Sequence, residues 1–212
     1  MINAVPIKRK SISALTLLSE NKYFIITLFF LILGMLIGAV SINKLGNQFL
    51  NFIEGFFKSF IEYRTSAGFF SVFFKAFFSG TLYMFIIAIS AFGISGLPII
   101  PTVVFFRGFG TCALAGILYR NYSLTGIAFA DLILLPSCLI TSFIIVFAAA
   151  KSLELSSKFT DILRDVSSRG ILVRPMCAGL IKTILWCMIA VIISSVIEAA
   201  FSTCFIGYFN FT

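Results

Sequence analysis

The sequence contains no histidine and few charged residues, and both shortages restrict its chemistry. None of its 212 residues is histidine, and Asp, Glu, Lys and Arg together make up only 11%. A soluble domain usually carries about 25% charged residues. Without histidine the chain has no Ser-His-Asp triad, no His-based metal site and no imidazole base. With so little charge it cannot cover a soluble surface, so a soluble globular domain is nearly excluded.

Hydrophobic residues take the place of the missing charge. They make up 60% of the chain, with 27 phenylalanines against one tryptophan, and the mean hydropathy is +1.10. Disordered chains need low hydrophobicity and high net charge, so disorder is excluded as well. The remaining class is an integral membrane protein with most of its mass in the bilayer.

Chemistry-bearing motifs are also missing from the sequence. The five cysteines are dispersed through apolar stretches without a C-x-x-C pair, which argues against a disulfide framework or a zinc site. The chain has no phosphate-binding Gly-x-x-x-x-Gly-Lys-Ser/Thr motif, no nucleophile elbow and no carboxylates paired for acid–base work. We therefore expect no enzyme activity, no cofactor, no metal and no nucleic-acid partner.

Hydropathy predicts an all-α polytopic fold with five transmembrane helices. A helix crosses the hydrocarbon core in about 20 residues. The predicted spans are 23–43, 75–94, 97–119, 123–150 and 176–199. A break at 93–101 separates the second span from the third, because Gly96 and Pro98 suit the end of one helix and the first turn of the next. Pro136 is expected to kink the fourth span.

The basic residues predict the orientation of this single membrane domain, residues 1–212. The segments 1–22 and 151–174 hold four and five basic residues and share one side under five spans. The other side receives five. The positive-inside rule therefore places the N-terminus and the 151–174 loop in the cytoplasm and the C-terminus outside the cell.

The first outer loop, 44–72, contains an amphipathic pattern. Within 45–63 its phenylalanines recur at helical spacing, and polar residues occupy the opposite face. The pattern predicts a helix that lies on the outer leaflet or packs its aromatic face on the bundle. In both cases it is a candidate docking surface for an extracytoplasmic partner, through Phe49, Phe52, Phe56, Glu54, Lys58 and Glu62.

Ionisable residues inside spans are costly and are functional candidates by default. Depth along the helices places Arg107 and Asp131 near one another, so we hypothesise that they pair across adjacent spans. The pair would either fasten two helices together or take part in transport or signalling. Glu198, near the outer end of the last span, is expected to pair with Lys75 or Arg120, or to reach the interface.

Small residues indicate where helices approach closely. Gly34-x-x-x-Gly38 in the first span is a helix-packing motif, and Gly108 marks the third span in a similar way. Close packing of this kind needs no catalytic chemistry. It also leaves open whether the chain forms a homo-oligomer.

Four segments, taken in order, resemble one family. They are an early FFLILGMLIGA pattern, GISGLPIIPTVVFFRGFGTCALAGIL with its Gly-x-Pro break, LILLPSCLI with a proline in mid-span, and VIEAAFS with an acidic residue closing the last helix. On five spans and about 200 residues the set resembles the stage II sporulation protein M family, from about residue 20 to 205. The chain departs from the family pattern at Ser137 and Cys138, where polar amides are common, and at 201–204, where Thr-Pro usually follows the acidic motif.

The resemblance implies a non-catalytic membrane scaffold of endospore-forming bacteria. Members of the family act in engulfment of the forespore, in the mother-cell or septal membrane. They are thought to anchor two extracytoplasmic peptidoglycan hydrolases, a lytic transglycosylase and an amidase/endopeptidase. The main alternative is a membrane subunit of an ABC-type permease-like transporter, with the 151–174 loop docking a separate ATPase. An intramembrane enzyme is the least supported alternative, because the chain has no histidine and no paired acids.

Overall fold

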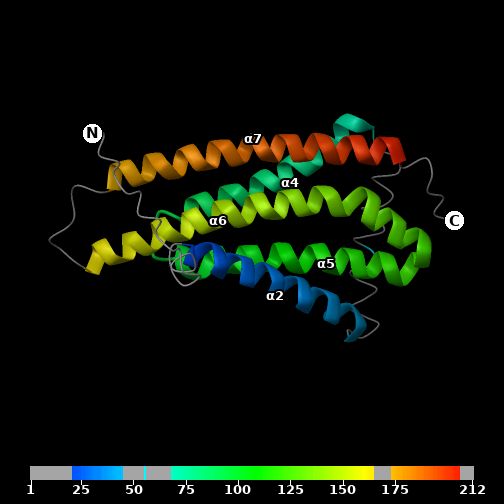
Figure 1. Cartoon of the computed structure of the whole chain (residues 1–212), viewed down its shortest axis with the longest axis horizontal. Helices are drawn as coiled ribbons and strands as arrows, with labels where there is room; N and C mark the ends of the chain where they lie inside the picture. Colours follow the sequence, from blue (N-terminus) through cyan, green and yellow to red (C-terminus); the bar gives the residue numbers. More distant parts are fainter. Residues whose placement is uncertain (1–20, 45–54, 56–67, 165–172, 206–212) are drawn as a thin grey trace, which may run out of the picture.

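The fold consists of long helices in a bundle. The computed structural model describes residues 21–44, 55, 68–164 and 173–205, and these contain no strand. Five of the helices are long and apolar enough to cross a membrane, so the predicted all-α, five-span architecture is confirmed. The elements, shown in Figure 1, are α2 (Lys22–Lys44), α4 (Phe69–Ser90), α5 (Gly96–Phe129), η1 (Ala130–Leu134), α6 (Leu135–Arg164) and α7 (Val173–Phe205).

Large apolar side chains cover the outside of the bundle as well as its core. Leu36, Phe70 and Trp186 are 63%, 74% and 65% exposed. In water such a surface would be unstable, whereas in lipid it is the solvated face. The helical form follows from the same environment, since a helix satisfies its backbone hydrogen bonds within one segment.

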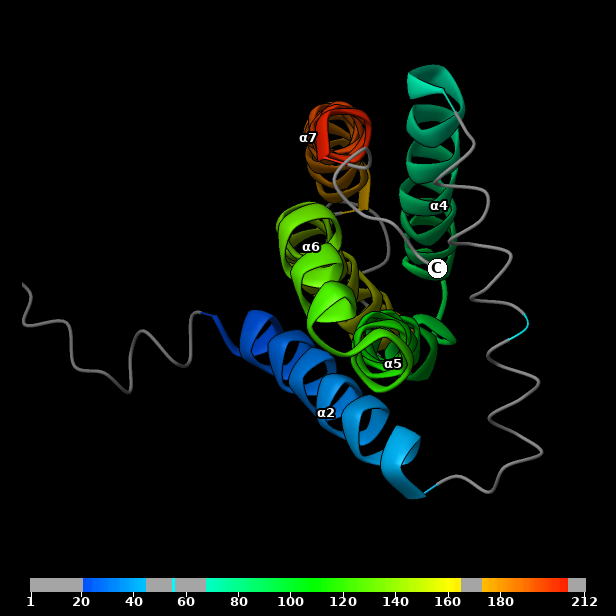
Figure 2. The same cartoon turned by 90° about the vertical axis from the view of Figure 1, so that its right-hand side faces the viewer.

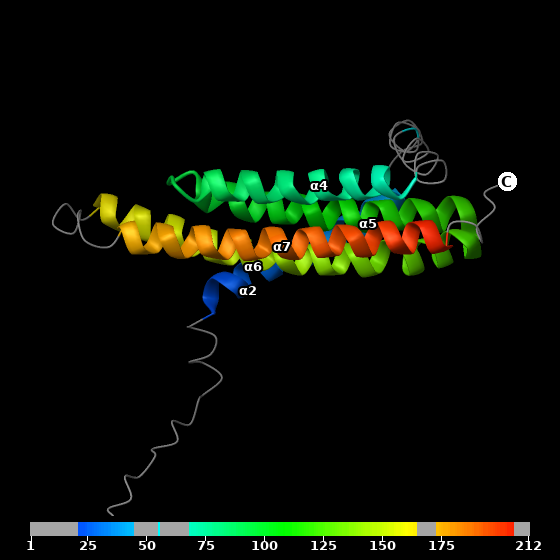
Figure 3. The ribbon, with the colours of Figure 1, turned by 90° about the horizontal axis from the view of Figure 1, so that it is seen from above.

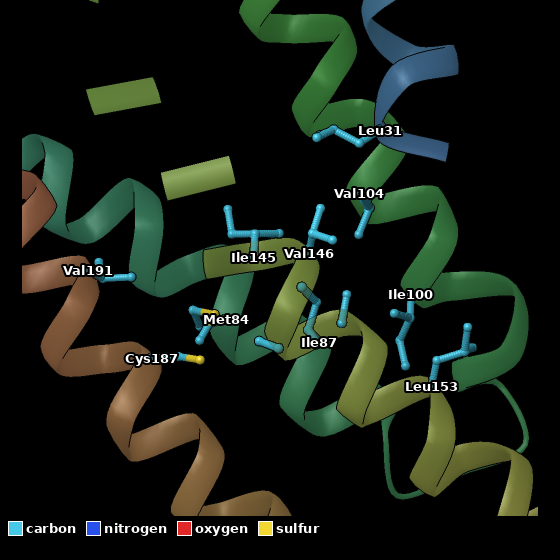
Figure 4. Close-up of a cluster of buried hydrophobic side chains, with 12 residues drawn as sticks. Leu31, Met84, Ile87, Ile100, Val104, Ile145, Val146, Leu153, Cys187 and Val191 are labelled. Carbon is cyan, nitrogen blue, oxygen red and sulfur yellow. The ribbon is translucent and has the colours of Figure 1, made fainter. Parts of the chain in front are cut away.

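Helix α6 lies at the centre and contacts each of the other four helices. Figures 1 and 2 show α2 crossing α5 on one side of it, while α4 and α7 lie on the other side. Side chains from all five helices meet in the main core, drawn in Figure 4, where Leu31, Ile87, Val104, Val146 and Val191 come from α2, α4, α5, α6 and α7 in turn.

The closest helix crossing joins α2 to α5 and depends on glycine. A Cβ atom on Gly34 would fall on the carbonyl oxygen of Phe105, and one on Gly38 would lie 2.5 Å from that of Phe109. From the other side, a Cβ on Gly108 would meet the carbonyl oxygen of Leu31. Backbones approach this closely only where side chains are absent, as in small-xxx-small packing of membrane helices.

The predicted break between the second and third spans is present. Helix α4 ends at Ser90 and α5 begins at Gly96, with Pro98 in its first turn, where a missing N–H leaves no bond unmade. The Ser156 hydroxyl of α6 donates to the carbonyl oxygen of Gly93 at 2.7 Å. The turn is therefore fastened to the central helix.

The predicted kink at Pro136 takes a different form. The helix widens into the π-helical turn η1 just before the proline, and the backbone N–H of Leu135 donates to the carbonyl of Ala130, five residues back. Proline at 136 has no N–H for the usual bond, so a wider turn there accommodates it. Helical structure continues from Gly96 to Arg164, and the ribbon reverses at one end of the bundle between the spans Gly96–Arg120 and Gly126–Ile162 (Figure 1).

Three predicted boundaries need correction. Helix α4 begins at Phe69 rather than 75, and α7 extends to Phe205 rather than 199. Most of the predicted 151–174 loop is helix: α6 runs to Arg164, α7 starts at Val173, and 165–172 lies outside the described residues. Figure 3 shows α6 and α7 extending together past the other helices.

Ion pairs mark this helical extension. Glu154 accepts hydrogen bonds from Lys151 at 3.2 Å and from Lys158 at 2.7 Å. Their side chains are largely exposed, so each pair contributes only about 0.3–0.5 kcal/mol. The segment predicted as a loop carries its charges at near-helical spacing, and spacings of three and four let a helix pair its own charges.

Candidate functional site

A cavity of about 210 Å³ lies between α4, α5, α6 and α7, and it brings together ionisable residues that are far apart in the sequence. Lys75 of α4, Arg107 of α5 and Glu198 of α7 all line it. The other lining residues are Val72, Ala76, Ser79, Gly80, Gly110, Thr111, Leu114, Leu134, Cys138 and Thr141. Three of the four intramembrane charges predicted from the sequence therefore share one site.

Small side chains create the space. Ala76, Ser79 and Gly80 lie on one face of α4, and Gly110 faces them from α5, one turn after Arg107. A Cβ atom added at Gly110 would have no heavy atom within 4 Å. Figure 2 shows α4 leaning away from α5 toward the end at which α4 begins.

Arg107 contacts α4 through its charged group. Its guanidinium lies over the ring of Tyr83, 5.4 Å from the centroid, a cation–π contact between α5 and α4. Its Nε atom is buried, and within the described part of the chain no acceptor reaches it. A buried donor of a charged group without a partner is costly, so this atom marks a place where an acceptor is expected.

Lys75 and Glu198 approach the cavity from the same end of the bundle. Lys75 is six residues from the start of α4 and Glu198 seven from the end of α7, which gives depths of about 9 Å and 10 Å. Glu198 therefore lines the same cavity as Lys75, one of the two partners predicted for it, and the pairing itself stays a prediction. Arg120, the other proposed partner of Glu198, instead donates to the carbonyl oxygen of Ile42 at 3.4 Å.

Asp131 has a different partner from the one predicted. Its Oδ1 accepts a hydrogen bond from the Tyr119 hydroxyl at 2.8 Å, and Asp131 is absent from the cavity that Arg107 lines. The hypothesis of an Arg107–Asp131 pair is therefore corrected. Tyr119 and Asp131 flank the reversal between two spans, so the turn itself places them side by side, whereas Arg107 faces α4.

A hydroxyl network that was not predicted from the sequence supports the cavity wall. Thr141 of α6 and Ser194 of α7 lie 2.8 Å apart, hydroxyl to hydroxyl, and both are buried. The Thr141 hydroxyl donates to the carbonyl oxygen of Ser137 at 2.8 Å. The Ser194 hydroxyl oxygen lies 3.2 Å from the same carbonyl oxygen. The i,i+4 spacing of Ser137 and Thr141 in an apolar span was the available signal, since hydroxyls in membrane helices often bond across interfaces.

The lining is suited to binding a charged group. Two cations, one carboxylate and several hydroxyls converge on it. Within the described ranges no group of three His, Cys, Asp or Glu residues could hold a metal ion. The predicted docking residues at 49–62 lie outside the described residues.

Five apolar helices that pack around glycine contacts and enclose a charged cavity define a multi-pass helical membrane protein. Within that class, the sequence model of the stage II sporulation protein M family matches residues 26–203. The chain belongs to this family, as its motifs predicted, and the family marks it as a sporulation membrane protein. Comparison with curated proteins and with solved structures gives no match.

Proposed function

We propose that the protein is a non-catalytic membrane scaffold that holds peptidoglycan hydrolases at the septum during forespore engulfment. The observation that carries the proposal is the family match, which covers parts of all five spans. The lining of the charged cavity holds cations, a carboxylate and hydroxyls, which are groups that can bind a charged ligand. The expected partners are an extracytoplasmic lytic transglycosylase and an amidase/endopeptidase.

The proposal requires an orientation that exposes the segment 44–72 outside the cell. An odd number of spans places the start of α2 and the end of α7 at opposite ends of the bundle, as in Figure 1. Excess basic charge at 1–22 and 151–174 favours the cytoplasm for the start of α2. We expect alkaline phosphatase fused after the last residue to be active in intact cells, and the same enzyme fused before the first residue to be inactive. The reverse pattern would invert the topology and remove the outer docking surface.

The scaffold function predicts that the hydrolases lose their position when the protein is absent. Fluorescent lytic transglycosylase and amidase/endopeptidase would be imaged in sporulating source cells with and without the chain. Both are expected to concentrate at the septum in the first case and to spread over the membrane in the second, because nothing else tethers them there. Unchanged septal signals in the deletion strain would contradict the scaffold function.

A variant separates docking from membrane insertion. The triple charge reversal Glu54→Lys, Lys58→Glu and Glu62→Lys is expected to spread the hydrolases while the protein remains in the membrane fraction at normal amount. The matched control is the reversal of Lys151 and Glu154 (Lys151→Glu, Glu154→Lys), which swaps an exposed pair on the opposite side of the proposed topology. Equal effects of both variants would argue against 44–72 as the docking surface.

The cavity favours a second candidate function, the membrane subunit of a transporter. Charged residues within a bundle often line substrate paths. The α6–α7 extension would then be the surface for an ATPase (Figure 3). Under this alternative the hydrolases keep their septal position in the deletion strain, and a cytoplasmic ATPase encoded near the gene co-purifies with the protein.

A further inference from the structure

The charged cavity carries an excess of positive charge. Among the described residues of its lining, Lys75 and Arg107 are cations and Glu198 is the one carboxylate. A net charge inside a membrane domain is costly unless a counter-ion accompanies it. A bound group with a single negative charge would balance these three side chains.

The geometry around Arg107 indicates the kind of group. Its buried Nε has a hydrogen to donate and no acceptor among the described residues, while Tyr83 covers one face of the guanidinium. Arginine binds oxyanions through parallel N–H bonds, and phosphate and carboxylate oxygens fit its fork. The hydroxyl of Ser79 lies in the same lining as a further donor, whereas the Thr111 hydroxyl already donates to the carbonyl oxygen of Arg107 at 2.8 Å.

The size and opening of the cavity limit the ligand to a small headgroup. Its volume of about 210 Å³ is below the roughly 300–1,000 Å³ of pockets that enclose whole drug-sized molecules. Lys75, Ser79 and Gly110 are exposed at its mouth, between α4 and α5. A group that enters there can leave an attached hydrocarbon chain outside, against the apolar surface of the helices.

We propose that this cavity binds the phosphate group of a molecule whose net charge is negative. Arg107 and Lys75 are the cationic residues that contact this phosphate. The bilayer supplies such a group as the phosphodiester of an anionic phospholipid, and inorganic phosphate supplies the same chemistry from water. The opening toward the side of the bundle favours the lipid. Glu198 accepts a headgroup hydroxyl and keeps the site from attracting a second anion.

Native mass spectrometry of the purified full chain tests the proposal. The protein would be titrated with phosphatidylglycerol, with net-neutral phosphatidylcholine, and with inorganic phosphate in the presence of phosphatidylcholine. A one-to-one phosphatidylglycerol adduct is expected, with a dissociation constant at least about tenfold below that of phosphatidylcholine, the effect of roughly one charge-assisted hydrogen bond. Adducts of inorganic phosphate alone would support the phosphate site and assign the free ion as its source.

Two variants test the location. Arg107→Gln removes the cation, and Gly110→Leu fills the cavity from a position where an added Cβ meets nothing within 4 Å. Both are expected to weaken the adduct about tenfold or more. The matched control is Gly179→Leu on α7, another helical glycine with nothing within 4 Å, and it should bind as the wild type does.

The Gly110→Leu variant keeps the proposal testable if Arg107→Gln does not fold. Wild-type binding by folded Gly110→Leu protein would overturn the proposed site. Equal affinity for the two lipids without any phosphate adduct would overturn the phosphate chemistry as well. The scaffold function is unaffected by either result, because it is read from the position of the hydrolases.

Discussion

Replacing Gly34 by leucine is expected to lower the free energy of unfolding by about 3 kcal/mol or more, the upper range for overpacking. The added side chain would start on the carbonyl group of Phe105 and lie near the backbone nitrogen of Phe109. Backbone atoms cannot turn aside as a flexible side chain does, so α2 and α5 must separate along their shared crossing. Thermal unfolding of the detergent-solubilised protein, followed by circular dichroism, measures the change.

Gly179→Leu is the control for this substitution. It adds the same side chain to a membrane helix at a position where a Cβ meets no atom within 4 Å. Its midpoint is expected to stay close to that of the wild type. If the two leucine variants unfold at the same temperature, the tight α2–α5 crossing does not contribute to stability in the way its geometry indicates.

The glycine crossing shows what the sequence predicted well. Span number, the Gly93–Pro101 break and the Gly34-x-x-x-Gly38 motif are local signals, each contained in one continuous stretch of the sequence. Lipid leaves the chain few alternatives, because an uncharged run of about 20 residues must form a helix there. The five-helix fold followed from hydropathy alone for that reason.

The partner of each charged residue could not be predicted from the sequence, because depth along a helix is only one of the two coordinates that place a side chain. Arg107 and Asp131 were matched by depth, yet Arg107 turns toward Tyr83 of α4 while Asp131 bonds to Tyr119. The second coordinate is the rotation of each helix about its axis. Packing sets that rotation through contacts such as the one between Gly108 and Leu31, and these contacts join segments far apart in the chain.

The ends of the helices were also predicted inaccurately, because helices continue into charged residues beyond the apolar spans. Hydropathy ends a span where polar residues begin, so the predicted fourth span ends at residue 150. The polar residues instead continue α6, since Glu154 bonds to lysines three positions before it and four after it. A helix that leaves the membrane has the same backbone as one inside it, and only the partners of its side chains change.

Replacing Glu198 by glutamine is expected to lower the free energy of unfolding by about 1–2 kcal/mol, less than the roughly 3–5 kcal/mol for breaking a fully buried ion pair, because Lys75 is exposed and Arg107 and Glu198 are only half-buried. The side chain keeps its shape, but Lys75 and Arg107 then share the cavity without a carboxylate. The two positive charges then repel each other, and the attraction of each to the carboxylate is lost. Both effects are larger where little water screens the charges. Thermal unfolding in a neutral detergent measures the effect, and added salt should reduce it only partly because the site is half-buried.

The double variant Glu198→Gln with Lys75→Met decides whether charge balance is the cause. It restores the wild-type net charge of the lining, with Arg107 as its remaining ion, so most of the lost stability should return. Lys75→Met alone leaves one cation opposite one carboxylate and is expected to cost less than Glu198→Gln. If the double variant is as unstable as the sum of the two single variants, Glu198 acts through a specific contact and the excess positive charge does not govern the cavity.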